Sequence, residues 1–405
     1  MPFPLFFDVL LHNIPIGTIT YIGNDRTIFS FKESYLLDQN RATLSLGFKD
    51  QSGKIISDFS PTQTRLLPFF SNLLPEGHLR QYLADRLGVK SMREFFLLWI
   101  LGEDLPGAIT ILPQGDISLI KDTHEQTSSI TDSKETFRFS LAGVQLKFSA
   151  VINTTGGLTI PASGVGGSWI IKLPAFQFSH VPENEFSMMT LAKKMGMDIP
   201  DIKLIDLRSI HNLPEELISK EEKALAIKRF DRTEMGTAIH IEDFAQVFSI
   251  YPEDKYGKAS FKNILQVLIN ETTEVDIAEF IRRLVFNTLI GNADMHLKNW
   301  SLIYSDQKKP RLAPAYDFIS TIPYIADNNA ALNFSRTKRF DKFTVDELKH
   351  LAIKAGASEP LIIQTALETV ARFYDHWEKE KHHLLLSKET IEMIERHLKT
   401  IPLAY

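Results

Sequence analysis

Cysteine is absent from this chain, and so are long apolar runs and a strong excess of either charge sign. Without cysteine, the protein can form neither a disulfide nor a zinc-thiolate site, and it has no thiolate nucleophile. No apolar run reaches the roughly 18 residues that a membrane-spanning helix requires, and the longest candidate, 95–101, is typical of a buried helix. We therefore expect a protein that makes no contact with a membrane.

The net charge, the first residues and the chain length limit further what kind of protein this can be. A formal net charge of −5 argues against a free-standing nucleic-acid-binding protein. The first residues lack the basic region of a secretory signal and reach Asp8 early, so we expect a cytoplasmic protein. A chain of 405 residues exceeds what one hydrophobic core usually serves, which predicts several subdomains.

The first part of the chain has the pattern of a small sheet followed by helices. Alternating apolar residues on both sides of a turn at 12–17 predict a hairpin. Further short strands are expected at 28–31 and 42–48, and helical patterns run from about 66 to 101. A polar stretch over 117–136, rich in threonine, serine and aspartate, predicts a linker.

A second strand-rich part follows this linker. The expected strands are 147–152, 158–161, 169–173 and 224–230. Between the last two, apolar residues spaced as in a helix predict a helix over 183–195, with Glu185 on its core-facing stripe. Beyond Arg232 the chain is expected to be mostly helical.

The most informative segment is 289–299, LIGNADMHLKN, which combines an acid and an amide. Asp294 precedes Asn299 by five positions, and Asp317 follows Asp294 after 23. This is the order of a kinase catalytic loop and a metal-binding aspartate. Asp294 would accept the proton of the attacking hydroxyl, and the oxygen atoms of Asn299 and Asp317 suit Mg²⁺. The alternative is a polar loop in which the Gly-Asn pair at 291–292 only ends a helix.

Charged residues elsewhere complete a nucleotide site. Lys172 lies in an apolar strand, and if it points inward it is a ligand for phosphate. Its expected counter-ion is Glu185, with Glu183 as a competing candidate. Within the acidic loop, Lys298 would neutralise the transferred phosphoryl group, and His296 would orient the loop or serve a purely structural role.

Taken in order along the chain, these segments resemble the HipA family, the serine/threonine kinase toxins of bacterial type II toxin-antitoxin modules. The residues that carry the resemblance are 140–147, 169–174, 183–185, 228–232, 291–299 and 313–317, with 74–77 and 103–108 in the first part. The resemblance implies an α+β, bilobal protein-kinase-like fold with an N-terminal β-rich subdomain. The expected parts are the N-terminal subdomain at 1–116, the linker at 117–136, an ATP-binding N-lobe at 137–232 and a mainly helical catalytic C-lobe at 233–405.

The resemblance also implies further site residues, with ATP and Mg²⁺ as cofactors. Besides Lys172, Glu185 and Asn299, the expected ATP-binding residues are Gly143, Gln145, Lys147, Lys228, Arg229 and Phe230. The last three would form a hinge that reads adenine through backbone groups, while Asp231 and Arg232 are expected to form a structural ion pair. Ser140 matches a serine that the family phosphorylates on itself, although a serine at a strand start also suits a simple turn.

The resemblance implies that the protein is a growth-arresting toxin that phosphorylates another protein. The expected target is an aminoacyl-tRNA synthetase. A small helix-turn-helix antitoxin would bind the protein and carry the contact with operator DNA, in keeping with the acidity of this chain. Two alternatives stay open. One is a kinase acting on a host protein or a phosphoinositide, and the other is a non-catalytic scaffold for an antitoxin and DNA.

Overall fold

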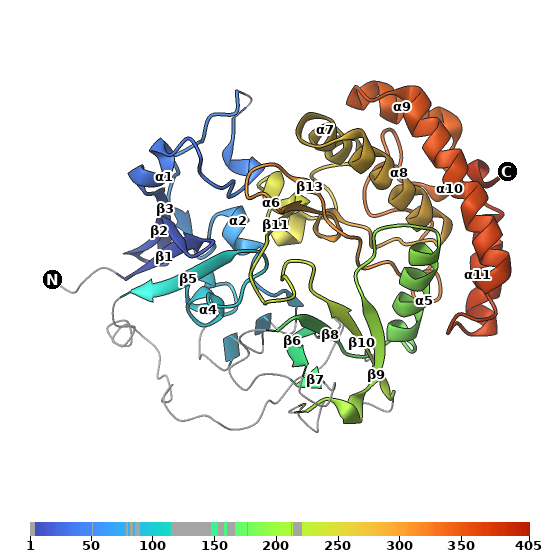
Figure 1. The fold of residues 1–405 in the computed structure, drawn as a ribbon, viewed down its shortest axis with the longest axis horizontal. Coiled ribbons are helices and arrows are strands. Elements are labelled where there is room, and N and C mark those ends of the chain that lie inside the picture. The colour runs from blue at the N-terminus through green and yellow to red at the C-terminus, as the bar shows by residue number, and fades with distance from the viewer. Residues whose placement is uncertain are drawn as a thin grey trace.

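The computed structural model describes residues 5–50, 52–77, 80–81, 84–85, 90–114, 147–152, 158–159, 167–175, 177–211, 213 and 221–405. Within these ranges the fold is α+β, with a β-rich N-terminal part and a mainly helical C-terminal part, as predicted. Figure 1 shows the N-terminal sheet on one side of the molecule, the last three helices on the opposite side and a second sheet between them. In the described part of the chain, no helix is both long and apolar enough to cross a membrane.

The N-terminal sheet is antiparallel and has the strand order β4-β3-β2-β1-β5. Its strands are β1 (Phe6–Leu11), β2 (Ile14–Gly23), β3 (Arg26–Phe31), β4 (Thr62–Gln63) and β5 (Ile109–Gln114). The predicted hairpin is β1-β2, whose turn is made by His12 and Asn13 at φ 51° and 62°. Helices pack with this sheet in a separate core that is rich in phenylalanine. The helices are α1 (Glu33–Leu37), α2 (Pro68–Ser71) and α4 (Glu94–Leu101).

One predicted strand of this part is wrong. Residues 42–48 form no strand, and only a short 3-10 helix occurs there, at Leu46–Phe48. The reason lies in a distant partner, because the Ser45 hydroxyl and the Leu46 N–H donate to the carboxylate of Glu242, far along the chain. The segment therefore satisfies its polar groups by docking against the C-terminal lobe and not by pairing with a strand.

The second sheet has the order β7-β6-β8-β10-β9. Its strands are β6 (Lys147–Ile152), β7 (Leu158–Thr159), β8 (Trp169–Lys172), β9 (Ile202–Asp206) and β10 (Lys223–Lys228), of which β9 was not predicted. Both faces of β10 are buried: Leu225 and Ile227 pack towards α5 (Val181–Lys194), and Ala224 and Ala226 pack into a smaller cluster on the other face. Because this strand is apolar on both faces, it positions the sheet firmly against α5.

The C-terminal lobe is mainly helical, as predicted, but it also holds a small sheet that was missed. Its helices are α6 (Phe244–Val247), α7 (Phe261–Glu271), α8 (Glu274–Leu289), α9 (Val345–Ala355), α10 (Glu359–Glu380) and α11 (Lys388–Leu398). The sheet consists of β11 (His240–Asp243), β12 (Ser301–Tyr304) and β13 (Arg311–Leu312). These strands have at most four residues, which is too short for an alternating pattern to be recognised. The strand β12 begins directly after the acidic loop and pairs with β11 and β13.

Candidate active site

Lys172, the last residue of β8, lies at the centre of the candidate site. In the sheet register it stands opposite Leu225 of β10, whose side chain packs towards α5. Its side chain is 5% exposed, and its Nζ donates to the carboxylates of Glu185 and Asp317. The lysine therefore points inward, as the nucleotide-site prediction requires, and ion pairs compensate its burial.

Glu185 is the counter-ion supplied by α5. It lies one turn before Met188 and Met189, which are fully buried, so the helix carries its carboxylate into the same core-facing stripe. The competing candidate, Glu183, instead lies 3.9 Å from Nδ1 of the exposed His180. The geometry thus decides between the two glutamates in favour of Glu185.

Lys147 adds a second cation to the cluster. It stands directly opposite Lys172 on the neighbouring strand β6, and its Nζ lies 3.7 Å from Oδ2 of Asp317. Two like charges facing each other across a sheet repel, and the shared carboxylate offsets this repulsion. With Glu185, the cluster contains two lysines and two carboxylates, so its formal charge is balanced.

The charge states of this cluster follow from its contacts. Burial alone would lower the pKa of Lys172, but the Asp317 and Glu185 carboxylates outweigh it and raise that pKa above its ordinary value. Burial would raise the pKa of Asp317, yet Lys147 and Lys172 hold it well below its usual range. Asp317 is therefore ionised, and each of its two carboxylate oxygens is paired with one of the lysines.

The backbone of Asp317 adopts the left-handed conformation, with φ at 57°. For a residue other than glycine this costs about 1 kcal/mol or more, and such strain persists where the surroundings impose it. Its carbonyl oxygen accepts a hydrogen bond of 3.1 Å from Nδ2 of the buried Asn292. Asn292 thus fixes the peptide that presents the carboxylate.

Asp294 follows α8 in the acidic loop and is half-buried. Its Oδ1 accepts a hydrogen bond of 2.7 Å from the hydroxyl of Tyr256. Its carbonyl oxygen accepts one of 2.8 Å from Nδ2 of Asn299, and one of the same length from the backbone N–H of His296. The amide nitrogen of Asn299 therefore ties the loop, and its amide oxygen is the atom suited to a metal ion.

His296 is buried within the loop and packs edge-on against Tyr256, with ring centroids 5.1 Å apart. Burial lowers the pKa of His296 to about 4, so its imidazole is neutral near pH 7. Among the described residues its Nδ1 has no hydrogen-bond partner. A buried, neutral ring that packs against a neighbour fits the structural alternative considered for this histidine.

Lys298 does not stand as a free cation beside Asp294, which corrects its predicted role. Its Nζ pairs with Oε1 of Glu76 at 2.6 Å and donates to the carbonyl oxygen of Asn72 at 3.2 Å. Glu76 also pairs with Lys255 at 2.7 Å, and although burial opposes them, the two lysines lower the pKa of Glu76 to about 2. Lys298 therefore joins the N-terminal part to the acidic loop.

The predicted hinge also needs correction. The backbone N–H of Lys228 donates to Asp201 and that of Arg229 to Ser168, so neither group is left to read a base. The Lys228 side chain pairs with Glu234 at 2.5 Å, at the surface. The third predicted hinge residue, Phe230, stacks on Tyr316, the residue before Asp317, with ring centroids 5.7 Å apart.

Arg229 serves the interface between the two parts of the molecule. Its buried guanidinium binds Asp231 through two nitrogens at 2.9 and 2.8 Å and reaches Asp104 at 3.2 Å. Arg232 pairs with the same two aspartates, which agrees with the expected structural ion pair. Since Asp104 belongs to the N-terminal part, this network binds that part to the second sheet and leaves Arg229 unsuited to hold ATP.

Three predicted residues, Ser140, Gly143 and Gln145, lie outside the described residues, as does the linker at 117–136. Two residues that the structure brings to the site were missed. Asn292 was considered only as part of a helix stop, and Tyr256 lies in an unpatterned loop 38 positions before Asp294, without any sequence signal. In the described part of the chain, no group of three or more His, Asp or Glu side chains forms a metal site.

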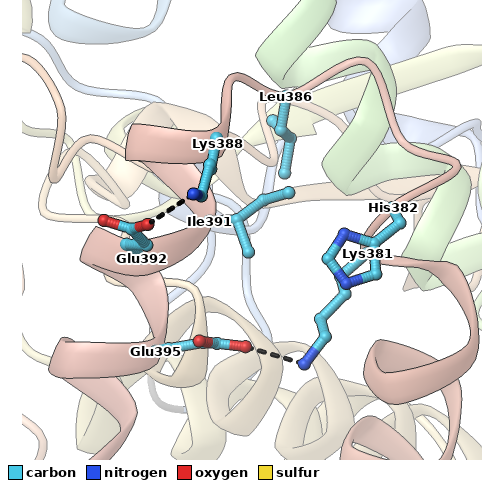
Figure 2. A pocket seen from close by; sticks show the side chains of 7 residues that line it. All are labelled: Lys381, His382, Leu386, Lys388, Ile391, Glu392 and Glu395. Atoms are coloured by element: carbon cyan, nitrogen blue, oxygen red, sulfur yellow. Dashed lines mark hydrogen bonds and ion pairs between the residues drawn. The ribbon is translucent and has the colours of Figure 1, made fainter.

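A surface cavity of about 480 Å³ lies away from these residues, between the end of α10 and the helix α11. Figure 2 shows its lining, in which Lys381 pairs with Glu395, Lys388 pairs with Glu392 on the same helix, and Ile391 is an apolar part of the wall. Because its charged side chains already have partners of opposite charge, the cavity offers no second candidate site.

Comparisons with known proteins place the whole chain in one family. The family model of the HipA-like C-terminal domain matches residues 139–377, and that of the HipA N-terminal domain matches 7–112. The provisionally named kinase Y4dM of Sinorhizobium fredii is 55% identical over 407 residues, which cover 100% of this chain and 98% of the relative. The serine/threonine-protein kinase toxin HipA of Shewanella oneidensis is 27% identical over 392 residues, or 88% and 84% of the two chains.

A solved structure supports the predicted bilobal, kinase-like fold. The chain in the complex of HipA, HipB and operator DNA from Shewanella oneidensis matches with a TM-score of 0.72 and 22% identity, over 98% of this chain and 96% of that one. The overall arrangement in Figure 1 is thus shared along nearly the full length. Both family models and the extensive identity lead to one conclusion: the chain belongs to the HipA family of kinases.

Proposed function

We propose that this protein is an ATP- and Mg²⁺-dependent serine/threonine protein kinase that acts as the toxin of a toxin-antitoxin module. One observation carries the proposal: the buried Lys172 is paired with Glu185 and Asp317, next to a loop that presents Asp294. A lysine, a glutamate, a metal-binding aspartate and a catalytic aspartate are the parts that a protein kinase uses to transfer a phosphoryl group.

The residues present fit a magnesium ion. The ionised carboxylate of Asp317 and the amide oxygen of Asn299 are hard oxygen ligands, and the phosphates of ATP and water would complete the shell. Bound there, Mg²⁺ would supply charge neutralisation for the phosphates. Lys172 and Lys147 would bind the phosphates as well, with Glu185 holding Lys172 in place.

Transfer of the phosphoryl group needs a base. Asp294 would accept the proton of a serine or threonine hydroxyl while that oxygen bonds to the γ-phosphorus and the bond from this phosphorus to the β–γ bridging oxygen breaks, releasing ADP. The hydrogen bonds from Asn299 and His296 hold the backbone of Asp294 and so orient its carboxylate. Positioning and charge, more than covalent chemistry, would then account for the rate.

The proposed partners follow from the family and its relatives. We propose a HipB-like helix-turn-helix antitoxin that carries the DNA contact, an aminoacyl-tRNA synthetase as the protein target, Ser140 as a site of self-limiting phosphorylation and the cytoplasm as the location. The related complex from Shewanella oneidensis contains HipB and operator DNA, which supports the first of these. A purified HipB-like antitoxin should co-elute with this protein in gel filtration.

The proposal is tested by incubating the protein with γ-labelled ATP and Mg²⁺, alone and with a bacterial extract. Wild type and an Asp375→Ala control, which changes an exposed aspartate on α10, should label a protein band, whereas Asp317→Ala and samples with EDTA should not. Mass spectrometry of the band identifies the target, and Ser140→Ala reports on self-labelling. Labelling of lipid alone would favour a phosphoinositide kinase, and no labelling by wild type would favour a scaffold.

A further inference from the structure

We infer that Asn292 is a positioning residue, which fixes the candidate base Asp294 and the candidate metal ligand Asp317 relative to each other. This inference rests on the proposed function, since it assigns a role within that same site. Asn292 acts through hydrogen bonds to the backbone of the two aspartates.

The side chain of Asn292 connects the two segments directly. Its Nδ2 donates to the carbonyl oxygen of Asp317 at 3.1 Å, and its Oδ1 accepts from the backbone N–H of Asp294 at 3.0 Å. One planar amide therefore spans two residues that are 23 positions apart in the chain. The side chain is 1% exposed, so water does not compete for these bonds.

A third bond orients the amide. Nδ2 also donates to Oδ1 of Asn287, one turn back in α8, at 2.9 Å. Asn287 is fully buried, and its own Nδ2 donates to the carbonyl oxygen of Arg283 at 2.8 Å. The rigid helix α8 thus fixes the direction in which Asn292 points.

The end of α8 places Asn292 where it can do this. The N–H of Gly291 donates to the carbonyl oxygen of Thr288, and that of Asn292 to Asn287, which is the pattern of a Schellman helix end. Gly291 has φ at 67°, and a Cβ there would lie 2.3 Å from Ile322. The Gly-Asn pair therefore ends α8 and also places the Asn292 side chain between the backbones of Asp294 and Asp317.

Loss of this amide should affect the metal site more than the fold. Without Asn292 the strained peptide of Asp317 loses its hydrogen bond from Nδ2, and the N–H of Asp294 loses its acceptor. Groups that orient a metal ligand from behind typically change metal affinity or activity by roughly 10- to 100-fold. We expect an effect of this order for Asn292→Ala on Mg²⁺-dependent nucleotide binding, together with a lower kcat.

The test uses the full-length protein and two readouts. The Kd of a non-hydrolysable ATP analogue is measured by calorimetry at several Mg²⁺ concentrations, and kcat and KM for ATP are measured by phosphate incorporation. The variants are Asn292→Ala and Asn287→Ala. The second removes the orienting acceptor together with the hydrogen bond to Arg283, and it should show a smaller change in the same direction. The control is Thr344→Ala, which removes a side-chain cap at the start of α9.

The outcomes separate the inference from the proposed function. A higher Kd at low Mg²⁺ for Asn292→Ala, with the Kd of Thr344→Ala unchanged, supports the role of Asn292. If wild type also transfers no phosphate, the proposed function fails while the role of Asn292 stands. Wild-type binding and kcat in a folded Asn292→Ala would overturn it. Equal shifts in Asn292→Ala and Thr344→Ala would also overturn it, because they would show a general loss of stability. If Asn292→Ala does not fold, Asn287→Ala decides by the same criteria.

Discussion

Lys147 and Lys172 face each other on neighbouring strands, and the carboxylate of Asp317 contacts both ammonium groups. This aspartate comes from the C-terminal lobe, whereas both lysines belong to the second sheet, so the contact joins the two lobes of the kinase-like fold. A cluster that is balanced in charge can open to admit a ligand of mixed charge, such as Mg²⁺ with ATP phosphates, without leaving a buried charge unpaired.

The pairing of Lys172 with Glu185 leads to a prediction about stability and activity together. Lys172→Met should lower the free energy of unfolding by about 3–5 kcal/mol, because it leaves the buried Glu185 carboxylate unpaired. The double variant Lys172→Met/Glu185→Gln should recover most of this stability yet bind no ATP. Urea unfolding and analogue binding measure the two effects. If the double variant were no more stable than Lys172→Met, the ion pair would not explain the loss.

Arg229 should contribute to the stability of the fold and not to ATP binding. Arg229→Met removes a guanidinium that binds Asp231 and Asp104, and Arg232 keeps only part of that network. We expect a loss of roughly 1–3 kcal/mol in the free energy of unfolding, with an unchanged Kd for an ATP analogue. A large increase in that Kd, in protein that calorimetry shows to be folded, would restore Arg229 as a nucleotide ligand.

Glu242 should make stability depend on pH. Burial raises its pKa to about 7 from an ordinary 4.5, although Ser45, Tyr304 and the Leu46 N–H donate to its carboxylate and oppose this. A folded-state pKa above the unfolded one means that its favourable contribution is complete below pH 4.5 and is lost as the pH rises through about 7. The difference corresponds to about 3 kcal/mol.

The measurement is urea unfolding of wild type and Glu242→Gln at pH 5 and pH 8. Wild type should lose more stability over this interval than the variant, by up to about 3 kcal/mol. Asp243, whose pKa burial raises to about 6, and His240, whose pKa burial lowers to about 4, remain in both proteins and cancel in the comparison. Identical pH dependence in the two proteins would show that Glu242 does not titrate there.

The hydroxyl of Tyr256 donates a hydrogen bond of 2.7 Å to Oδ1 of Asp294. This is the distance at which the hydroxyl of a protein substrate would have to bind the same carboxylate. This contact should compete with the substrate, so Tyr256→Phe should lower the KM for the protein acceptor roughly fivefold, the equivalent of about 1 kcal/mol for one hydrogen bond. Steady-state rates against acceptor concentration measure it. A lower kcat with the same KM would instead mean that Tyr256 orients the base.

Patterns carried by neighbouring residues could be predicted from sequence, and contacts between distant segments that no motif marks could not. The hairpin β1-β2, the helix α5 and the mainly helical C-terminal lobe follow from periodicity and turn residues. The segment 42–48 was mistaken for a strand because its partner, Glu242, lies almost 200 positions away. The strands β11, β12 and β13 are too short to have a period of their own.

The same limit applies to the candidate site. Lys172, Glu185 and Asp317 were identified together, and the structure brings them into contact. Lys298 is predicted to neutralise the transferred phosphoryl group and Arg229 to bind ATP, because nothing in the local sequence reveals that Glu76 and Asp104 reach them from the N-terminal part. Asn292 was visible only as a helix stop, since its three side-chain hydrogen bonds depend on how the chain returns at Asp317.

The central claim is that Asp294 serves as the base in phosphoryl transfer at this site. The most direct test is the initial rate of phosphate incorporation at saturating ATP and Mg²⁺, for wild type and Asp294→Ala, with analogue binding as the control for an intact site. We predict that the rate falls by about 10²- to 10⁴-fold while the Kd of the analogue stays within a factor of about 3. Equal rates for the two proteins would contradict the account.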